Sequence, residues 1–185
     1  MIDDFVSDAT RRMDKSVEAA AHEFNTVRTG RASAALLDRI QVDYYGTPTP
    51  LQQLATINVP EPRMITVQPY DPGSIKAIER AILESDLGLT PSNDGKIVRL
   101  PIPQLTEERR KELVKVVKHL AEEGRVAVRN VRRDVMHDLK ELVKNGDVGD
   151  DEERRGEAQV QKLTDEHTKA IDELLKHKEA EIMEV

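Results

Sequence analysis

The chain has 185 residues and a formal net charge of −7, with 34% charged and only 3% aromatic residues. It contains no cysteine, which excludes disulfides, thiol catalysis and cysteine-ligated metals. Its first residues are acidic where a signal peptide would be basic, and no apolar run approaches ~18 residues. We therefore expect a cytoplasmic protein without a membrane segment.

The first predicted element is a long helix over residues 2–29. Apolar residues recur there at spacings of three and four, which is typical of one buried helix face. This face consists of Ile2, Val6, Ala9, Met13, Val17, Ala20, Phe24 and Val27. Thr29 and Gly30 are predicted to end the helix. Arg28 would then lie in the last turn, where a cation interacts favourably with the helix dipole.

The pattern then changes, because all nine prolines lie between Pro48 and Pro103. Alternating apolar residues, bounded by turn residues, indicate short strands rather than long helices. The strands are predicted at residues 39–44, 54–59, 64–68 and 96–100.

A short helix is predicted among these strands. Asp71-Pro72 favours a helix start, because it places a capping side chain before a proline at the first helical position. Gly88 is expected to end the helix. The buried face is predicted to consist of Ile75, Ile78, Ile82 and Leu83. Strands and helix together indicate a small α/β module.

A second long helix is predicted over residues 106–145, with Thr106 as its cap and Glu107 and Glu108 in its first turn. Its apolar side is predicted to consist of Leu113, Val116, Val117, Leu120, Gly124, Ala127, Val131, Val135 and Leu142. Its opposite side is basic and carries Lys111, Lys115, Lys118, Arg125, Arg129, Arg132, Arg133, Lys140 and Lys144. This segment has 11 basic and 8 acidic groups, so it is positive within an acidic chain. Such asymmetry permits local phosphate binding.

A third helix is predicted from Asp150 onward, with an apolar seam of Val160, Leu163, Ala170, Ile171, Leu174 and Ile182. None of the three long helices can bury its apolar stripe alone. We therefore predict an α+β fold with two domains. A three-helix bundle, discontinuous in sequence, is formed by residues 1–30 and 105–185, and a small α/β domain of residues 31–104 is inserted into it.

The chain would cross between these domains at two short segments. Short crossings break few contacts when domains swing, which favours a hinge. The predicted hinge residues are Gly30, Arg31, Pro101 and Pro103.

The second helix contains a cluster of four arginines within nine residues: Arg125, Arg129, Arg132 and Arg133. Guanidinium is planar, permanently charged and suited to bidentate phosphate contacts, so the cluster indicates an anion-binding surface. Arg132 is predicted to point nearly opposite the apolar seam. The alternative interpretation is a solvated face that keeps a long helix soluble.

No enzyme chemistry is indicated. The five histidines include no pair at the i, i+4 spacing of a helical metal site, and we expect no metal and no cofactor. The stretch from Gly88 to Lys96 departs from a phosphate-binding loop in its glycine spacing and in the residue after the lysine. No nucleophile motif is present. We therefore predict that the protein is not an enzyme.

Five blocks of the sequence carry a family resemblance. They are residues 27–32 (VRTGRA), 42–51 (VDYYGTPTPL), 85–89 (SDLGL), 105–111 (LTEERRK) and 126–133 (VAVRNVRR). In this order, over nearly the whole chain, they resemble the signature blocks of ribosome recycling factors. Two positions depart from the family pattern. Ala34 stands where proline is common, and Gly124 where alanine is usual.

The resemblance implies a translation factor that functions in ribosome recycling after translation termination. Such factors have a three-helix bundle and a hinged α/β domain. They bind the large ribosomal subunit through the bundle and, with elongation factor G, split the post-termination complex, while the elongation factor hydrolyses GTP. By the resemblance, Arg129, Arg132 and Arg133 match the ribosomal-RNA-binding arginines, and Arg28 and Arg31 belong to the block beside the hinge. We add Arg125 from its helix face alone, and we expect a monomer in solution.

A competing function class is an adaptor whose helices pair with partner helices. That class predicts apolar residues on the outer face of the bundle, where the sequence instead places basic ones.

Overall fold

The computed structural model describes residues 1–184, and its mixture of helices and sheet confirms the predicted fold class. The described chain forms two compact units. A helical unit comprises Met1–Thr29 and Glu107–Glu184, and an inserted unit comprises Gly30–Thr106. Among the described helices, none has the length and hydrophobicity needed to cross a membrane.

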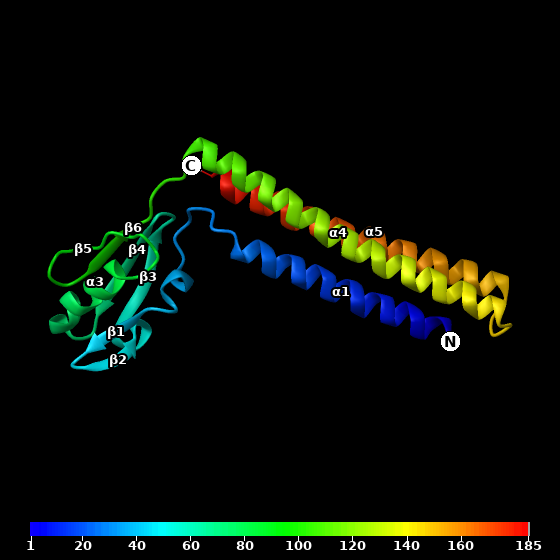
Figure 1. The fold of residues 1–185 in the computed structure, drawn as a ribbon, viewed down its shortest axis with the longest axis horizontal. Coiled ribbons are helices and arrows are strands. Elements are labelled where there is room, and N and C mark those ends of the chain that lie inside the picture. Colours follow the sequence, from blue (N-terminus) through cyan, green and yellow to red (C-terminus); the bar gives the residue numbers. More distant parts are fainter. Residues whose placement is uncertain (185) are drawn as a thin grey trace. The chain divides into compact units, whose positions relative to one another are not determined.

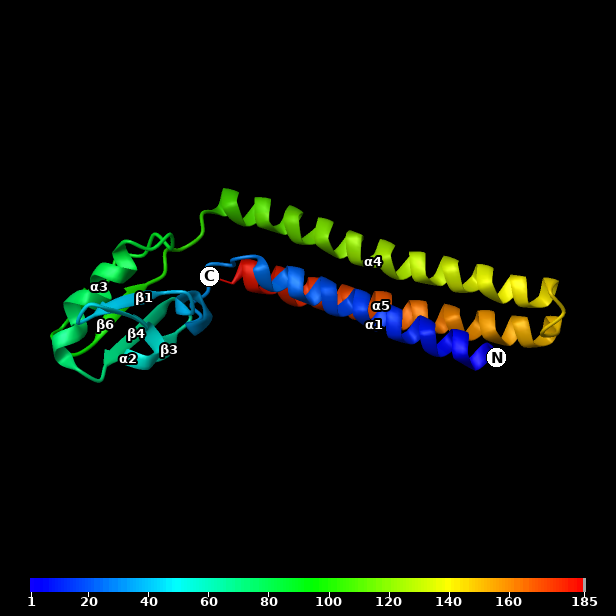
Figure 2. The ribbon, with the colours of Figure 1, turned by 60° about the horizontal axis from the view of Figure 1, so that its bottom comes forward.

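The helical unit is a three-helix bundle of α1 (Ile2–Thr26), α4 (Glu107–Lys144) and α5 (Asp150–Met183). Each helix packs against both others, and α4 and α5 run side by side along their lengths (Figures 1 and 2). The acidic first turns of α4 and α5 suit the positive ends of their helix dipoles.

Helix α1 ends three residues earlier than predicted. Val27 adopts an extended conformation, with φ −81° and ψ 118°, and its N–H closes the last turn on the carbonyl of Phe24. Arg28 therefore lies beyond the helix, and the prediction that it occupies the last turn was wrong. The predicted seam nevertheless supplies all four buried residues of α1, namely Ala9, Met13, Ala20 and Phe24.

The buried face of α4 is turned relative to the predicted one. It consists of Leu113, Val117, Ala121, Gly124, Val128, Val131, Val135 and Leu139. Val116 was placed on this face but is 45% exposed. Val116 precedes the buried Val117 and is turned about 100° from it around the helix, so it lies beside the core.

The inserted unit contains a two-stranded hairpin and a four-stranded antiparallel sheet of order β3-β4-β6-β5. The strands are β1 (Gln41–Tyr44), β2 (Thr47–Pro50), β3 (Ala55–Glu61), β4 (Met64–Pro69), β5 (Ser92–Asn93) and β6 (Val98–Pro101). The helical segments are η1 (Ala34–Leu37), α2 (Leu51–Leu54), η2 (Pro72–Ser74) and α3 (Ile75–Leu83).

Two strand segments were not predicted because they contain proline. Strand β2 contains Pro48 and Pro50 and was not predicted. It is paired only with β1, and a strand at a sheet edge tolerates residues that lack an N–H. Strand β3 continues through Pro60, where the predicted strand stops. The β3–β4 register shifts between Asn58 and Glu61, and such a bulge accommodates the proline.

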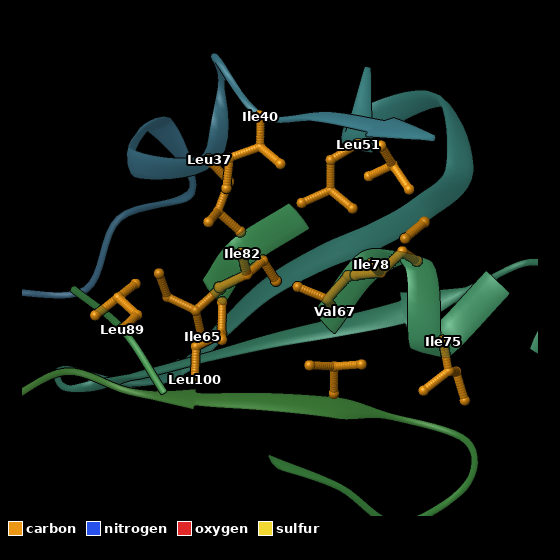
Figure 3. Packing of buried hydrophobic residues seen from close by; sticks show 13 residues of the cluster. Leu37, Ile40, Leu51, Ile65, Val67, Ile75, Ile78, Ile82, Leu89 and Leu100 are labelled. Atoms are coloured by element: carbon orange, nitrogen blue, oxygen red, sulfur yellow. The ribbon is translucent and has the colours of Figure 1, made fainter. Parts of the chain in front are cut away.

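The core of the inserted unit lies between the sheet, α3 and the β1–β2 hairpin (Figure 3). Ile82 of α3 lies beside Ile65 and Leu100 of the sheet, and Ile78 lies beside Val67. Leu83, predicted to be buried, is 60% exposed because it follows Ile82 around the helix and leaves the inner face.

Both ends of α3 can be compared with the predictions. The predicted cap is confirmed for η2, the short segment that leads into α3, because the Asp71 carboxylate accepts a hydrogen bond from the N–H of Gly73 and Pro72 opens the segment. The predicted stop at Gly88 was too late. The helix ends at Leu83, where the N–H of Glu84 bonds the carbonyl of Arg80.

The two chain segments that leave the inserted unit are both attached to one turn of it. The N–H of Ala32 donates to the carbonyl of Pro62 at 2.7 Å, and the N–H of Ile102 donates to the carbonyl of Arg63 at 2.8 Å. Gly30 has φ +74°, and a Cβ atom there would lie 2.8 Å from Cγ of Leu105. Only glycine fits this backbone conformation and this close approach.

Candidate functional site

Three of the four clustered arginines, Arg125, Arg129 and Arg132, lie on the part of α4 that faces α5. Glu122, Arg125, Arg129 and Arg132 recur at spacings of three and four, so they form one row along the helix. An open groove between α4 and α5 is lined by this row on one side. Its other side consists of Gln161, Thr164, Asp165, Thr168 and Asp172 of α5.

Arg125 is the most enclosed of these cations, with 21% of its side chain exposed. It donates to Asp172 of α5 at 2.7 Å and to Glu122 at 3.1 Å. Burial disfavours the charged form of Arg125, but the bonds to both carboxylates outweigh it and raise the pKa of Arg125. Arg125 therefore links α4 to α5 as well as adding charge to the groove.

Arg129 is more open, with 55% of its side chain exposed. It also donates to Glu122, at 3.1 Å, so one carboxylate holds two guanidinium groups. Hydrogen bonds from Arg125 and then from Arg129 lower the pKa of Glu122. These two arginines are therefore partly neutralised within the bundle.

Arg132 is half-buried, and its predicted direction was wrong. It follows the buried Val131, so it lies about 100° from that residue and beside the core. Its Nε donates to Oε1 of Gln161 in α5 at 2.7 Å. Gln161 in turn donates through Nε2 to Oδ1 of Asp165 at 2.9 Å.

Arg133 is exposed and donates to the side-chain oxygen of Asn130 at 2.6 Å. With Arg129 and Arg132 it lines a second hollow, which also includes His137 and Lys140. The basic surface therefore continues from the groove toward the C-terminal end of α4.

The remaining predicted residues lie elsewhere in the chain. Arg28 is exposed beyond α1 and does not line either groove. Arg31 is exposed and belongs to the inserted unit, as do Gly30, Pro101 and Pro103.

Sequence reasoning missed the α5 side of the groove. Gln161, Asp165, Thr168 and Asp172 recur at spacings of four, three and four, which is one polar row on a helix. That periodicity was readable, but only the contact with α4 reveals which polar row of α5 faces the arginines. Glu122 was also missed, because its position in the sequence does not distinguish it from the other acidic residues of α4.

Chemically, the site offers fixed guanidinium donors in a polar groove. Such donors form charge-assisted, geometrically specific hydrogen bonds with phosphate and carboxylate. Over residues 1–184, no group of three or more His, Asp or Glu side chains is arranged to hold a metal ion. The arrangement supports binding of a polyanion.

Known proteins share both the sequence and the fold. A family model described as ribosome recycling factor matches residues 20–183. The ribosome-recycling factor of Rubrobacter xylanophilus is 62% identical over 180 residues, with 97% of each chain covered. That of a Geobacillus species (strain WCH70) is 55% identical over 185 residues, with both chains fully covered.

Solved structures agree. The solution structure of a ribosome recycling factor matches with a TM-score of 0.72 and 43% identity, covering 100% of this chain and 98% of that one. The T. thermophilus ribosome recycling factor, in a structure with E. coli elongation factor G bound to the E. coli post-termination complex, matches with a TM-score of 0.63, 47% identity and full coverage of both chains. The resemblance seen in the sequence is thus confirmed, and the chain belongs to the ribosome recycling factor family.

Proposed function

We propose that this chain is a translation factor that recycles ribosomes. It binds the large ribosomal subunit after termination and, together with elongation factor G, dissociates the post-termination complex. The T. thermophilus relative bound to that complex with elongation factor G supports this assignment. The observation in this chain that carries it is the arginine row of α4, a fixed cationic surface on a rigid bundle.

The surface proposed to contact ribosomal RNA consists of Arg125, Arg129, Arg132 and Arg133, extended by Arg28 and Arg31. Folded RNA exposes phosphates and 2′-hydroxyls, and a rigid helix reads these by shape and charge rather than by base sequence. The chain has few aromatic residues for stacking on single-stranded bases, which favours contact with folded RNA.

In this proposal the bundle (residues 1–30 and 105–185) binds RNA, and the inserted domain (residues 31–104) couples the bound protein to elongation factor G. Its hinge lies at Gly30, Arg31, Pro101 and Pro103, where only two chain segments connect the units. The protein is not an enzyme, since the elongation factor supplies GTP hydrolysis. It acts as a cytoplasmic monomer without a cofactor.

Arg132→Ala tests the binding surface. Loss of a charge-assisted phosphate contact, about 1.5–3 kcal/mol, should weaken large-subunit binding by roughly ten- to a hundredfold. The salt dependence of binding should also become shallower, because fewer counterions are released. Arg132→Lys should restore binding only in part, since an ammonium lacks the planar fork.

The measurement is co-sedimentation with large subunits at two salt concentrations, with thermal unfolding of each variant. Arg132→Ala should also lose about 1 kcal/mol of stability, because it removes the hydrogen bond to Gln161. Arg80→Ala, an exposed change in the inserted unit, is the control and should bind normally. Normal binding by Arg132→Ala would favour the alternative interpretation, in which the arginine row is a solvated helix face with no part in binding.

The hinge can be tested by fluorescence energy transfer, because the chain has no native cysteine. Cysteines introduced at the exposed positions Glu84 and Arg155 would carry one dye on each unit. Elongation factor G with GTP should shift the transfer efficiency of the ribosome-bound protein, whereas two dyes within the bundle should show no shift. An unchanged efficiency between the units during subunit splitting would contradict the hinge.

A further inference from the structure

The four clustered arginines are held in two different ways. Carboxylates hold Arg125 and Arg129, through Glu122 and Asp172. Neutral amides hold the other two, since Gln161 accepts from Arg132 and Asn130 accepts from Arg133. Among the described residues, Arg132 forms no ion pair with a carboxylate. A neutral acceptor restrains a guanidinium group without cancelling its charge.

The amide of Gln161 is itself oriented by Asp165. Since Asp165 accepts a hydrogen bond, the NH₂ group of Gln161 must face it. The carbonyl oxygen of the amide therefore faces Arg132, where it accepts the Nε–H at 2.7 Å. The carboxylate thus acts on the arginine through one intervening neutral group.

This arrangement sets which edge of the guanidinium group is available. With Nε turned toward α5, the four N–H donors on the two terminal nitrogens remain for a ligand. Those nitrogens form an end-on fork, and a planar fork suits two phosphate oxygens. A side chain restrained beforehand loses less conformational freedom on binding.

We propose that Gln161 is a positioning residue, oriented by Asp165, that presents Arg132 fully charged and end-on to an RNA phosphate. The inference rests on the proposed function, because it concerns how the same surface binds the large subunit. It identifies Arg132 as the phosphate anchor of the row and Arg125 as the link between α4 and α5.

The sharpest test exchanges the two acceptors in the double variant Gln161→Glu with Asp165→Asn. The carboxylate introduced at position 161 can accept from Arg132 and from the amide introduced at position 165, so both hydrogen bonds and the net charge are conserved. Only the position of the negative charge changes, and it now lies against Arg132. Thermal stability should be unchanged or higher. Large-subunit affinity should fall by up to roughly tenfold, less than on removal of Arg132, because the guanidinium group remains but is partly neutralised.

The control exchanges charge at two exposed positions of the same helix, Gln159→Glu with Glu166→Gln, and should bind normally. A second measurement repeats the acceptor exchange in Arg132→Ala protein, where it should weaken binding no further. Normal affinity of the exchanged protein, or an equal loss without Arg132, would overturn the positioning role. Failure of the wild-type chain to bind the subunit would instead overturn the proposed function.

Discussion

The two units use polar side chains in different ways. In the bundle, side-chain bonds join helices that are far apart in sequence, as in Arg12 to Asp134 and Arg125 to Asp172. In the inserted unit side-chain bonds between elements cover shorter sequence separations, as from Tyr44 to Asp71. Others stabilise single turns, as in the carboxylate of Asp94, which accepts from the N–H groups two and three residues later. Helices satisfy their own backbone groups, so side chains are left to join them, whereas strands are joined by the backbone.

Two glycines, one in each unit, also have different roles. Buried Gly124 of α4 lies where three helices meet, and a Cβ atom there would be 3.1 Å from Ile171 Cδ1 and 3.2 Å from Ala20 Cβ. Gly46, in the turn between β1 and β2, has φ +85° and no atom within 4 Å of an added Cβ. Gly124 thus permits the close approach of helices, whereas Gly46 permits a backbone conformation.

The largest expected effect comes from matched core substitutions, Ile78→Ala in the inserted unit and Ile171→Ala in the bundle. Both side chains are fully buried, and each truncation should cost about 2–5 kcal/mol. If the units are separate cooperative bodies, each variant should increase hydrogen exchange only in its own unit, measured by peptide-resolved mass spectrometry.

Large-subunit binding extends this test. Ile171→Ala should weaken it, because α5 positions the acceptors of the arginine row, while Ile78→Ala should leave it near normal at a temperature where both proteins stay folded. The exposed Leu83→Ala is the control and should change stability by less than about 0.5 kcal/mol. Increased exchange in both units after either truncation would mean that they unfold together.

A smaller effect is expected from two glycine-to-alanine changes. Gly46→Ala should destabilise the inserted unit by about 1–2 kcal/mol, since alanine disfavours positive φ. Gly124→Ala gains up to about 1 kcal/mol of helix propensity but tightens contacts with two helices, so its net effect should stay within about 1 kcal/mol of zero. Chemical unfolding measures both, and equal losses at the two positions would remove the distinction between close approach and conformation.

The smallest effect concerns acid stability. The backbone N–H of Ile97, then Arg99, then the N–H of Lys96 hold the pKa of Asp94 well below its ordinary value. A depressed carboxyl pKa stabilises the fold above the ordinary value, about 4, and this stabilisation is lost as pH falls through the lower pKa of the folded state. Asp94→Asn should therefore be less stable than wild type at neutral pH.

That difference should shrink as the pH is lowered below about 4. Thermal unfolding across a pH series checks the trend, with the exposed Asp86→Asn as control. A stability difference that stays constant down to strong acid would show that the Asp94 charge contributes nothing.

The sequence was sufficient to predict the helices whose apolar residues follow a strong helical period. Helix α4 begins and ends within one residue of its predicted bounds, and α5 begins at Asp150 as predicted, because long apolar stripes and acids in the first turn define them. It was insufficient where tertiary context overrides a local rule. Pro48 and Pro50 argue against a strand, yet β2 forms because β1 pairs with one of its edges.

The site was only partly predictable for a related reason. The pattern identified the arginines as a cluster, since charge and spacing are properties of α4 alone. The roles of Arg125 and Arg132 were not predictable, because they depend on Asp172 and Gln161. Which polar face of α5 meets α4 is set by the packing of both helices against α1, and no single helix carries that information.

The discontinuous bundle has a consequence for synthesis. Residues 30–106 of the inserted unit leave the ribosome before α4 and α5 exist, so that unit can fold first. Helix α1 must wait for both partners, on the order of ten seconds at ordinary elongation rates. During that interval its apolar seam lacks the surfaces that later cover it, so nascent α1 should be the segment of this chain most dependent on chaperones.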